Sequence, residues 1–166
     1  MSETIEAQQP TVTANTSDAV QTFVGKSYEY YQRKFELAPG SIKGFNVAAF
    51  FLGVVWMVYR KMYVYTAIVV ALLIIDAVLE TYFPLPEAVG KAITWGVYAA
   101  FGILGNMMYK AHVDKKVKEI STAYPPEQVN EQLAKQGGVN LAGAWAFGIG
   151  LLVLVGIVVW IIMADV

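Results

Sequence analysis

The sequence predicts an all-α integral membrane protein that has three transmembrane helices, a short re-entrant or interfacial segment and an N-terminal amphipathic helix. Three observations lead to this fold class. The chain is 57% hydrophobic and only 15% charged, which is more apolar than soluble domains usually are. Charged residues are absent from residues 44–59, 64–75, 92–109 and 141–164 and crowd the segments between them. Three predicted apolar segments, residues 63–83, 92–109 and 141–164, are long enough for a helix across the bilayer, which takes about 17 to 25 residues.

The chain before the first apolar segment divides into two parts. Residues 1–16 are polar and rich in Thr, Ser and Gln, which predicts a disordered tail. Residues 17–38 predict an amphipathic helix, because apolar side chains recur there at steps of three and four. These side chains are Val20, Val24, Tyr28, Tyr31 and Phe35. Tyrosine suits the headgroup zone of a membrane, so we expect an interfacial helix; packing on a partner protein is the alternative.

Residues 44–164 form the predicted membrane domain. Its apolar segments are 44–59, 63–83, 92–109 and 141–164. The first segment is shorter than a spanning helix needs. No helix breaker follows the third segment, so we expect one long helix to leave the bilayer there. The cytoplasmic helical loop, residues 110–140, then includes a short surface helix bounded by proline and glycine.

The distribution of lysine and arginine predicts the orientation, because cytoplasmic flanks are rich in both. Arg60 and Lys61 place the turn after the first segment inside, and the lysines of residues 110–118 place the long loop inside as well. The loop at residues 84–91 and the C-terminus are then outside. We therefore predict a multi-pass membrane protein.

The N-terminal region conflicts with a first segment that spans. The cations of residues 26–43 also indicate the cytoplasmic side, although residues 44–59 separate them from Arg60. If that segment crossed the membrane, both groups could not be inside. We expect the segment to bend near Gly53 and return, which leaves three spans. Four spans with a translocated N-terminal tail is the alternative.

Aromatic and basic side chains gather around the first segment, as they do where a protein meets lipid headgroups. The predicted headgroup contacts are Arg33, Lys34, Trp56, Tyr59, Arg60 and Lys61. A specific site for an anionic lipid would use the four cations of this set, whereas generic anchoring is the simpler interpretation. The expected partners are the lipid bilayer and other membrane proteins or further copies of the chain.

Asp76 and Glu80 form a predicted intramembrane polar site, because a carboxylate within a span is costly and usually faces protein or a water-filled cavity. They lie one turn apart on one face of the helix, in the outer half of the span. Such a pair has the chemistry to relay protons or bind a cation. A polar strip that reaches the outer water or pairs with Lys91 is the simpler interpretation.

Small residues on the last segment predict close helix packing. Ala142, Ala146 and Gly150 recur every fourth residue, and Ala144 and Gly148 repeat the spacing beside them. The third segment offers matching small or polar positions, namely Gly96, Gly102, Gly105 and Asn106. We expect packing within the chain; packing between copies is the alternative.

The sequence contains no evident catalytic constellation. It has no cysteine, which excludes disulfides and thiolate chemistry, and neither GxSxG nor HExxH occurs. His112 is the only histidine, and we expect it to face solvent or headgroups. A net charge of −1 offers no basic surface for nucleic acid. We expect no metal, no cofactor and no enzymatic activity.

The residues around the first segment carry a family resemblance. The motif consists of Asn46, Ala-Ala-Phe-Phe, Trp56 and Tyr-Arg-Lys-Met-Tyr within residues 45–63, preceded by Phe-Val-Gly-Lys-Ser-Tyr-Glu-Tyr-Tyr-Gln-Arg-Lys-Phe at residues 23–35. Over residues 23–120 the chain resembles the bacterial domain-of-unknown-function family 2628, a group of small membrane proteins. The resemblance implies a bacterial membrane protein and no particular activity. Members usually have proline after the glycine, whereas Val54 stands here, which disfavours a helix break at Gly53.

The function expected from these observations is that of a non-enzymatic accessory or assembly subunit that organises protein partners or lipids. A small transporter or channel component that uses Asp76 and Glu80 is the alternative. Because three helices enclose little pore, that alternative requires an oligomer.

Overall fold

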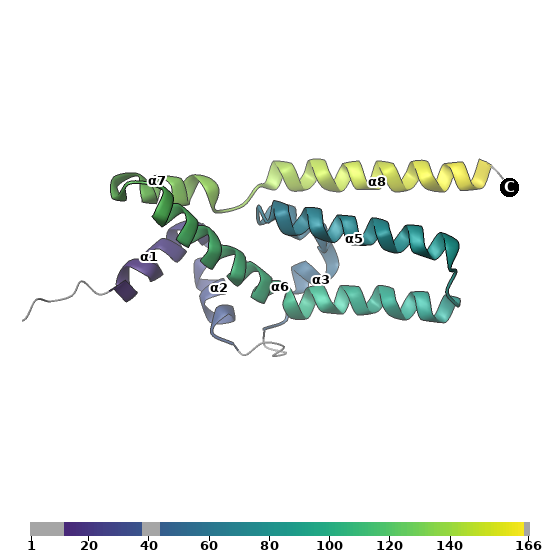
Figure 1. Ribbon diagram of the computed structural model, residues 1–166, viewed down its shortest axis with the longest axis horizontal. Helices are drawn as coiled ribbons and strands as arrows, with labels where there is room; N and C mark the ends of the chain where they lie inside the picture. The colour runs from purple at the N-terminus through teal and green to yellow at the C-terminus, as the bar shows by residue number, and fades with distance from the viewer. Residues whose placement is uncertain (1–11, 38–43, 165–166) are drawn as a thin grey trace, which may run out of the picture.

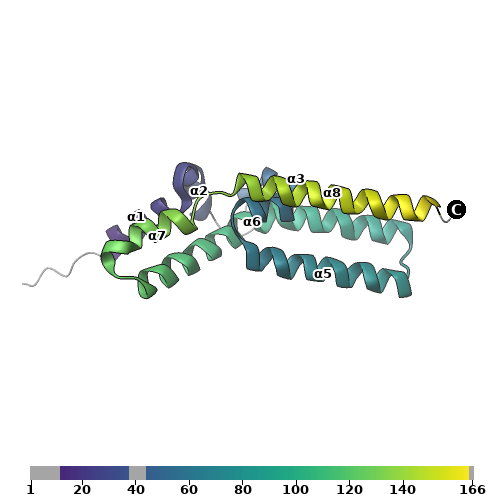
Figure 2. The same cartoon turned by 90° about the horizontal axis from the view of Figure 1, so that it is seen from above.

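The computed structural model describes residues 12–37 and 44–164, and over these residues it is all-helical, as predicted. The helices are α1 (Val12–Val24), the 3-10 helix η1 (Gly25–Ser27), α2 (Tyr28–Phe35), α3 (Val47–Leu52), α4 (Val54–Tyr59), α5 (Tyr63–Tyr82), α6 (Glu87–Ala123), α7 (Pro126–Gln136) and α8 (Leu141–Ala164). At one end of the elongated molecule α1, α2 and α7 gather around the second half of α6, and we call these elements the headpiece (Figure 1). At the other end α5, α8 and the first half of α6 run along the long axis (Figures 1 and 2).

Three helices, α5, α6 and α8, are long and apolar enough to cross a membrane. α5 has 20 residues and α8 has 24, or about 30 and 36 Å of helix against a hydrocarbon core of about 30 Å. α6 has 37 residues and continues without a break from its apolar first half into the headpiece (Figure 1). The prediction of three helices long and apolar enough to span a membrane is therefore confirmed.

The N-terminal helix differs from the prediction in its start and its continuity. α1 begins at Val12, so residues 12–16 are helical and do not belong to the predicted disordered tail. Gly25 has φ +69°, a conformation that glycine adopts without the cost a Cβ brings. This glycine divides the predicted helix of residues 17–38 into α1 and α2. The first eleven residues of the predicted tail and residue 38 lie outside the described residues.

The apolar faces of α1 and α2 cover the headpiece core and not a membrane surface. Phe23 and Tyr31 are only 1% and 2% exposed, and both belong to a core to which residues of α3, α4, α6 and α7 also contribute. Gly137 allows α7 to end directly against α1, because a Cβ at this position would collide with the carbonyl oxygen of Phe23. The amide of the next residue, Gly138, donates to that oxygen (2.7 Å).

The segment of residues 44–59 bends at Gly53, as predicted, and it does so without the proline that the family resemblance implies. Gly53 has φ +45°, and this conformation separates α3 from α4. Each of the two helices has six residues, or about 9 Å of length, so neither crosses the hydrocarbon. α2 therefore lies at the same end of the molecule as the turn that follows α4 (Figure 1), in agreement with three spans and not with four.

The bent segment, and not direct contact, holds the three spans together. We expected α8 to pack on α6, but these two spans and α5 make few contacts with one another. Instead α3 packs on α6 and α4 packs on α8 and α5. On α6, Gly102 and Gly105 make room for Phe45 and Ala49.

The small residues of α8 divide between two surfaces. Ala144 is 7% exposed, and a Cβ on Gly148 would lie 3.8 Å from Val55 of α4, so this stripe faces α4. Ala142, Ala146 and Gly150 are exposed. The predicted packing surface thus exists on α8, but its partner is α4 and only one of its two stripes is used in the described part of the chain.

Candidate functional site

Arg60 follows α4 and points into the junction between the spans and the headpiece. It is 7% exposed, and three aromatic rings surround its guanidinium group. The guanidinium carbon Cζ lies 4.5 Å from the ring centre of Tyr31, 5.1 Å from that of Tyr59 and 5.2 Å from that of Tyr109. We call these three tyrosines the aromatic cage. A cation over an aromatic face gains roughly 0.5 to 2 kcal/mol, so the cage stabilises the charge in part.

Hydrogen bonds do not satisfy the guanidinium group. Its Nη2 donates to Ser27 Oγ over a long distance of 3.4 Å, while Nε and Nη1 are buried and have no partner among the described residues. The hydroxyl of Tyr109 is likewise buried and unpaired in that part of the chain. Arginine keeps its charge at every physiological pH. Because a buried charge without a partner costs several kcal/mol, this group calls for an anion or an acceptor.

The aromatic cage does not supply that anion. Burial raises the pKa of Tyr31 above its ordinary value of 10.0, and the charge of Arg60 opposes this shift. Tyr31 is therefore a neutral phenol at pH 7. No ion pair joins Arg60 to a carboxylate within residues 12–37 and 44–164. The site presents one positive charge in an otherwise neutral, aromatic setting.

A groove opens beside Arg60, between the bent segment and α8. Its volume is about 1030 Å³. The polar end contains Arg60 and the tyrosines Tyr30, Tyr31 and Tyr59. The rest is lined mainly by apolar side chains of α3, α4 and α8, among them Phe51, Leu52, Val55, Trp145, Ile149 and Leu152. The groove thus joins one buried charge to a long apolar surface.

Lys61 has a structural position that the sequence did not predict. Its φ of +58° is unusual for a residue other than glycine, and its Nζ donates to the carbonyl oxygens of Lys135 (3.1 Å) and Gly137 (2.5 Å). These bonds satisfy carbonyl groups at the C-terminal end of α7. Nearby, the backbone N–H of Asn140 donates to the carbonyl oxygen of Tyr59 (2.8 Å). Lys61 therefore ties the headpiece to the spans.

The other predicted headgroup contacts have varied positions. Trp56 is 2% exposed and packs edge-on against Tyr109, with 6.2 Å between ring centres. Arg33 on α2 is exposed, and Lys34 is half-buried with its Nζ 5.6 Å from the ring centre of Tyr30. The prediction of headgroup contact is wrong for Trp56, because its indole ring fills the protein core.

His112 is also buried, contrary to the prediction of a solvated residue. It is 6% exposed and lies among three rings, with centres 6.0 Å from Phe23, 5.9 Å from Tyr65 and 6.5 Å from Tyr109. A helical stripe in the sequence could have revealed this position. His112 and Val113 lie three and four residues after Tyr109, and all three side chains face the headpiece core.

Asp76 and Glu80 lie at the end of the molecule away from the headpiece. Both are exposed, and both line a crevice of about 370 Å³ between the end of α5 and the start of α6. Lys91 pairs with Glu87 (2.6 Å). One sequence interpretation expected Lys91 to pair with the carboxylates of α5, and it does not pair with Glu80. Groups of three or more potential metal ligands are absent from the described residues.

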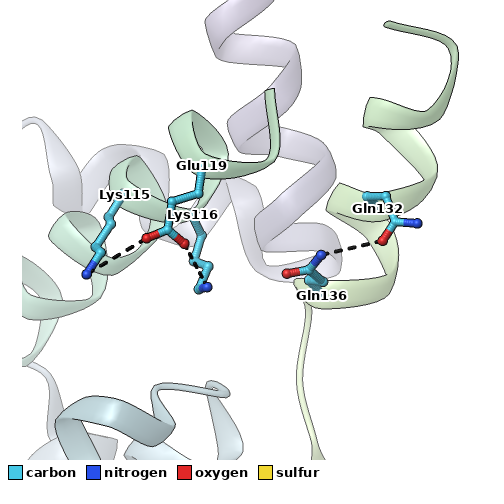
Figure 3. Close-up of polar contacts among 5 residues, drawn as sticks. All are labelled: Lys115, Lys116, Glu119, Gln132 and Gln136. Atoms are coloured by element: carbon cyan, nitrogen blue, oxygen red, sulfur yellow. Dashed lines mark hydrogen bonds and ion pairs between the residues drawn. The ribbon is translucent and has the colours of Figure 1, made fainter. Parts of the chain in front are cut away.

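Polar contacts join side chains within α6 and within α7 of the headpiece (Figure 3). On α6 Glu119 pairs with Lys116 (2.8 Å) and Lys115 (3.8 Å), and on α7 the amide of Gln136 donates to Gln132 (3.4 Å). The hydrogen bond from Lys116 lowers the pKa of Glu119. The two ion pairs of Glu119 are partly exposed and therefore contribute little stability.

The headpiece, the bent segment and the three apolar helices define a small polytopic helical membrane protein. The chain belongs to the family described as protein of unknown function (DUF2628), whose family model matches residues 12–115. This match confirms the predicted resemblance and includes Arg60 together with its aromatic cage. No curated protein and no solved structure matches the chain.

Proposed function

We propose that the chain is a non-enzymatic accessory or assembly subunit of a bacterial inner membrane, which organises protein partners or lipids. The observation that supports this proposal is the open arrangement of the spans. α5, α6 and α8 make few contacts with one another, and large apolar side chains of α5 and α8 are exposed along much of both helices. Because the spans do not close on themselves, other helices or lipid chains complete them.

In this proposal the headpiece faces the cytoplasm and the end of α8 faces outward. The described cations support that orientation, because cytoplasmic flanks are rich in lysine and arginine. Lys91 lies at the far end of the molecule; the other described cations lie at the headpiece or its junction with the spans. The C-terminal residues 165–166 are outside the described residues.

Photocrosslinking in native membranes tests the accessory role. A photoreactive amino acid replaces Ile75 on α5 or Trp160 on α8, which are 54% and 70% exposed. Met57, which is 0% exposed, is the matched control. We expect both exposed positions to capture the same membrane protein, which also co-purifies in constant proportion, and the control to capture none. If both exposed positions capture lipid alone, the protein-partner role is wrong and only the lipid-organising role remains.

A second candidate function is that of an oligomeric transporter or channel component. The supporting observation is the crevice that holds Asp76 and Glu80, since no ion pair to either carboxylate occurs among the described residues. Purified protein in liposomes should then conduct cations or protons, and Asp76→Asn and Glu80→Gln should abolish the flux. Liposomes that stay impermeable with a folded, oligomeric protein would exclude this candidate.

A further inference from the structure

We infer that the groove beside Arg60 binds one anionic phospholipid, whose phosphate pairs with the guanidinium group and whose acyl chains lie against α3, α4 and α8. This inference deepens the proposed function, because it names the lipid class that the chain organises. It rests on three properties of the groove: an unpaired buried charge, an apolar lining and a position at the membrane boundary.

The buried charge specifies the headgroup. Arg60 is 7% exposed and keeps two nitrogen atoms, Nε and Nη1, without partners in the described part of the chain. The guanidinium group has two donor edges, Nε with Nη2 and Nη1 with Nη2, and each edge keeps one nitrogen atom without a partner, which can donate to a phosphate oxygen.

The apolar lining specifies the rest of the ligand. A soluble phosphate ester would satisfy Arg60 but would leave the groove of about 1030 Å³ uncovered. The side chains of Phe51, Leu52 and Trp145 in this lining are 70%, 52% and 65% exposed, so hydrocarbon has direct access to them. An amphiphile satisfies the charge and the apolar lining together.

The position of the groove matches one leaflet of a bilayer. Arg60 lies just before α5 starts at Tyr63, and the Asn140 side chain, just before α8, donates to the Tyr63 hydroxyl (2.9 Å). Both spans therefore begin at the level of the aromatic cage. From Leu141 to Leu152 of α8, which both line the groove, the helix rises about 16 Å. This length is close to half of the roughly 30 Å hydrocarbon core.

The net charge of the ligand follows from the surroundings of Arg60. A zwitterionic lipid brings its own cation close to its phosphate, and that cation would then approach a guanidinium group that no described carboxylate offsets. An anionic lipid brings no such cation. Charge complementarity thus favours phosphatidylglycerol over phosphatidylcholine.

Native mass spectrometry of the full chain in detergent tests the inference. Phosphatidylglycerol and phosphatidylcholine are titrated separately, with soluble glycerol phosphate as a competitor. We expect one phosphatidylglycerol per chain, bound at least about tenfold more tightly than phosphatidylcholine, a difference of about 1.4 kcal/mol. Glycerol phosphate should not displace it. Equal binding of the two lipids, or displacement by glycerol phosphate at matched concentration, overturns the inference.

Two pairs of variants locate the site. Arg60→Gln should lower phosphatidylglycerol binding about tenfold or more, while Lys118→Gln, which removes an exposed cation, should not. Gly148→Leu fills the groove and should lower phosphatidylglycerol binding. Gly150→Leu is the control: it places the same side chain where nothing lies within 4 Å, outside the groove lining, and should leave binding unchanged. Thermal unfolding confirms that each variant is folded, and the Gly148 pair decides the matter if Arg60→Gln unfolds.

The two proposals can fail separately. Loss of selective lipid binding with crosslinked protein partners intact would refute the lipid site and leave the accessory role in place. If folded Arg60→Gln and Gly148→Leu both bind phosphatidylglycerol like the unaltered protein, the groove is not the lipid site. Crosslinking to no protein, with selective lipid binding intact, would refute only the partner-binding role.

Discussion

At the scale of single residues, two buried asparagines join the chain just before α3 to α6. Asn46 Nδ2 donates to Asn106 Oδ1 (2.8 Å), and Asn106 Nδ2 donates to the carbonyl oxygen of Gly44 (2.7 Å). Both asparagines are nearly fully buried, at 2% and 4% exposure. Amide groups removed from water require such partners, so each asparagine depends on the other.

Asn106→Ala should therefore destabilise the fold. The substitution leaves the Asn46 amide and the Gly44 carbonyl without partners, and we expect a loss of about 1 to 3 kcal/mol in unfolding free energy. Denaturant unfolding in detergent measures this loss. Asn130→Ala on the exposed face of α7 is the control and should change stability little. Equal midpoints for the two variants would show that the buried pair contributes no stability.

The sequence could predict that Arg60, Trp56 and Lys61 matter, but not what they contact. Aromatic rings beside cations are typical of a membrane interface, and the same residue types also form a buried cation–aromatic cluster. The distinction depends on α2 and α6, whose Tyr31 and Tyr109 close over Arg60 from positions far away in the chain. No local pattern encodes that contact.

At the scale of elements, apolar length was a reliable guide. The predicted segments of residues 63–83 and 141–164 correspond to α5 and α8, because an uninterrupted apolar run of that length forms one helix in a membrane. The break at Gly25 was missed. There the apolar spacing continues from Val24 to Tyr28 across the glycine, and spacing alone does not report a backbone with positive φ.

The bend at Gly53 gives a prediction at this scale. Gly53→Ala places a Cβ on a residue with φ +45° and ψ −117°, a sparsely populated conformation that costs an L-residue roughly 1 to 3 kcal/mol. Its nearest neighbour, the Phe101 ring at 3.7 Å, leaves room, so backbone strain is the main effect. Thermal unfolding in detergent should show a lower midpoint. Gly156→Ala on α8, where nothing lies within 4 Å, should show no loss; a similar drop in both would refute this explanation.

At the scale of the whole molecule, the bent segment explains how an open set of spans keeps one shape. The backbone N–H of Asn46, at the start of α3, donates to the carbonyl oxygen of Gly102 on α6 (2.7 Å), and α4 packs on α5 and α8. The headpiece then fixes the turn after α4 through Arg60 and Lys61. The sequence predicted the spans and the bend, but it also predicted that α8 packs directly on α6. Small residues on both helices are compatible with direct packing and with packing on other helices, so they do not distinguish the two arrangements.

The orientation of the whole chain is open to a direct test, because the chain has no cysteine and each single-cysteine variant therefore reports one position. The test positions are exposed: Glu29 and Lys118 in the headpiece and Glu87 at the opposite end. An impermeant maleimide applied to cells with a permeable outer membrane should label Glu87→Cys at once. It should label Glu29→Cys and Lys118→Cys only after the inner membrane is opened. External labelling of Glu29→Cys with Lys118→Cys protected would instead place the N-terminal helices outside, which requires residues 44–59 to span despite the bend at Gly53.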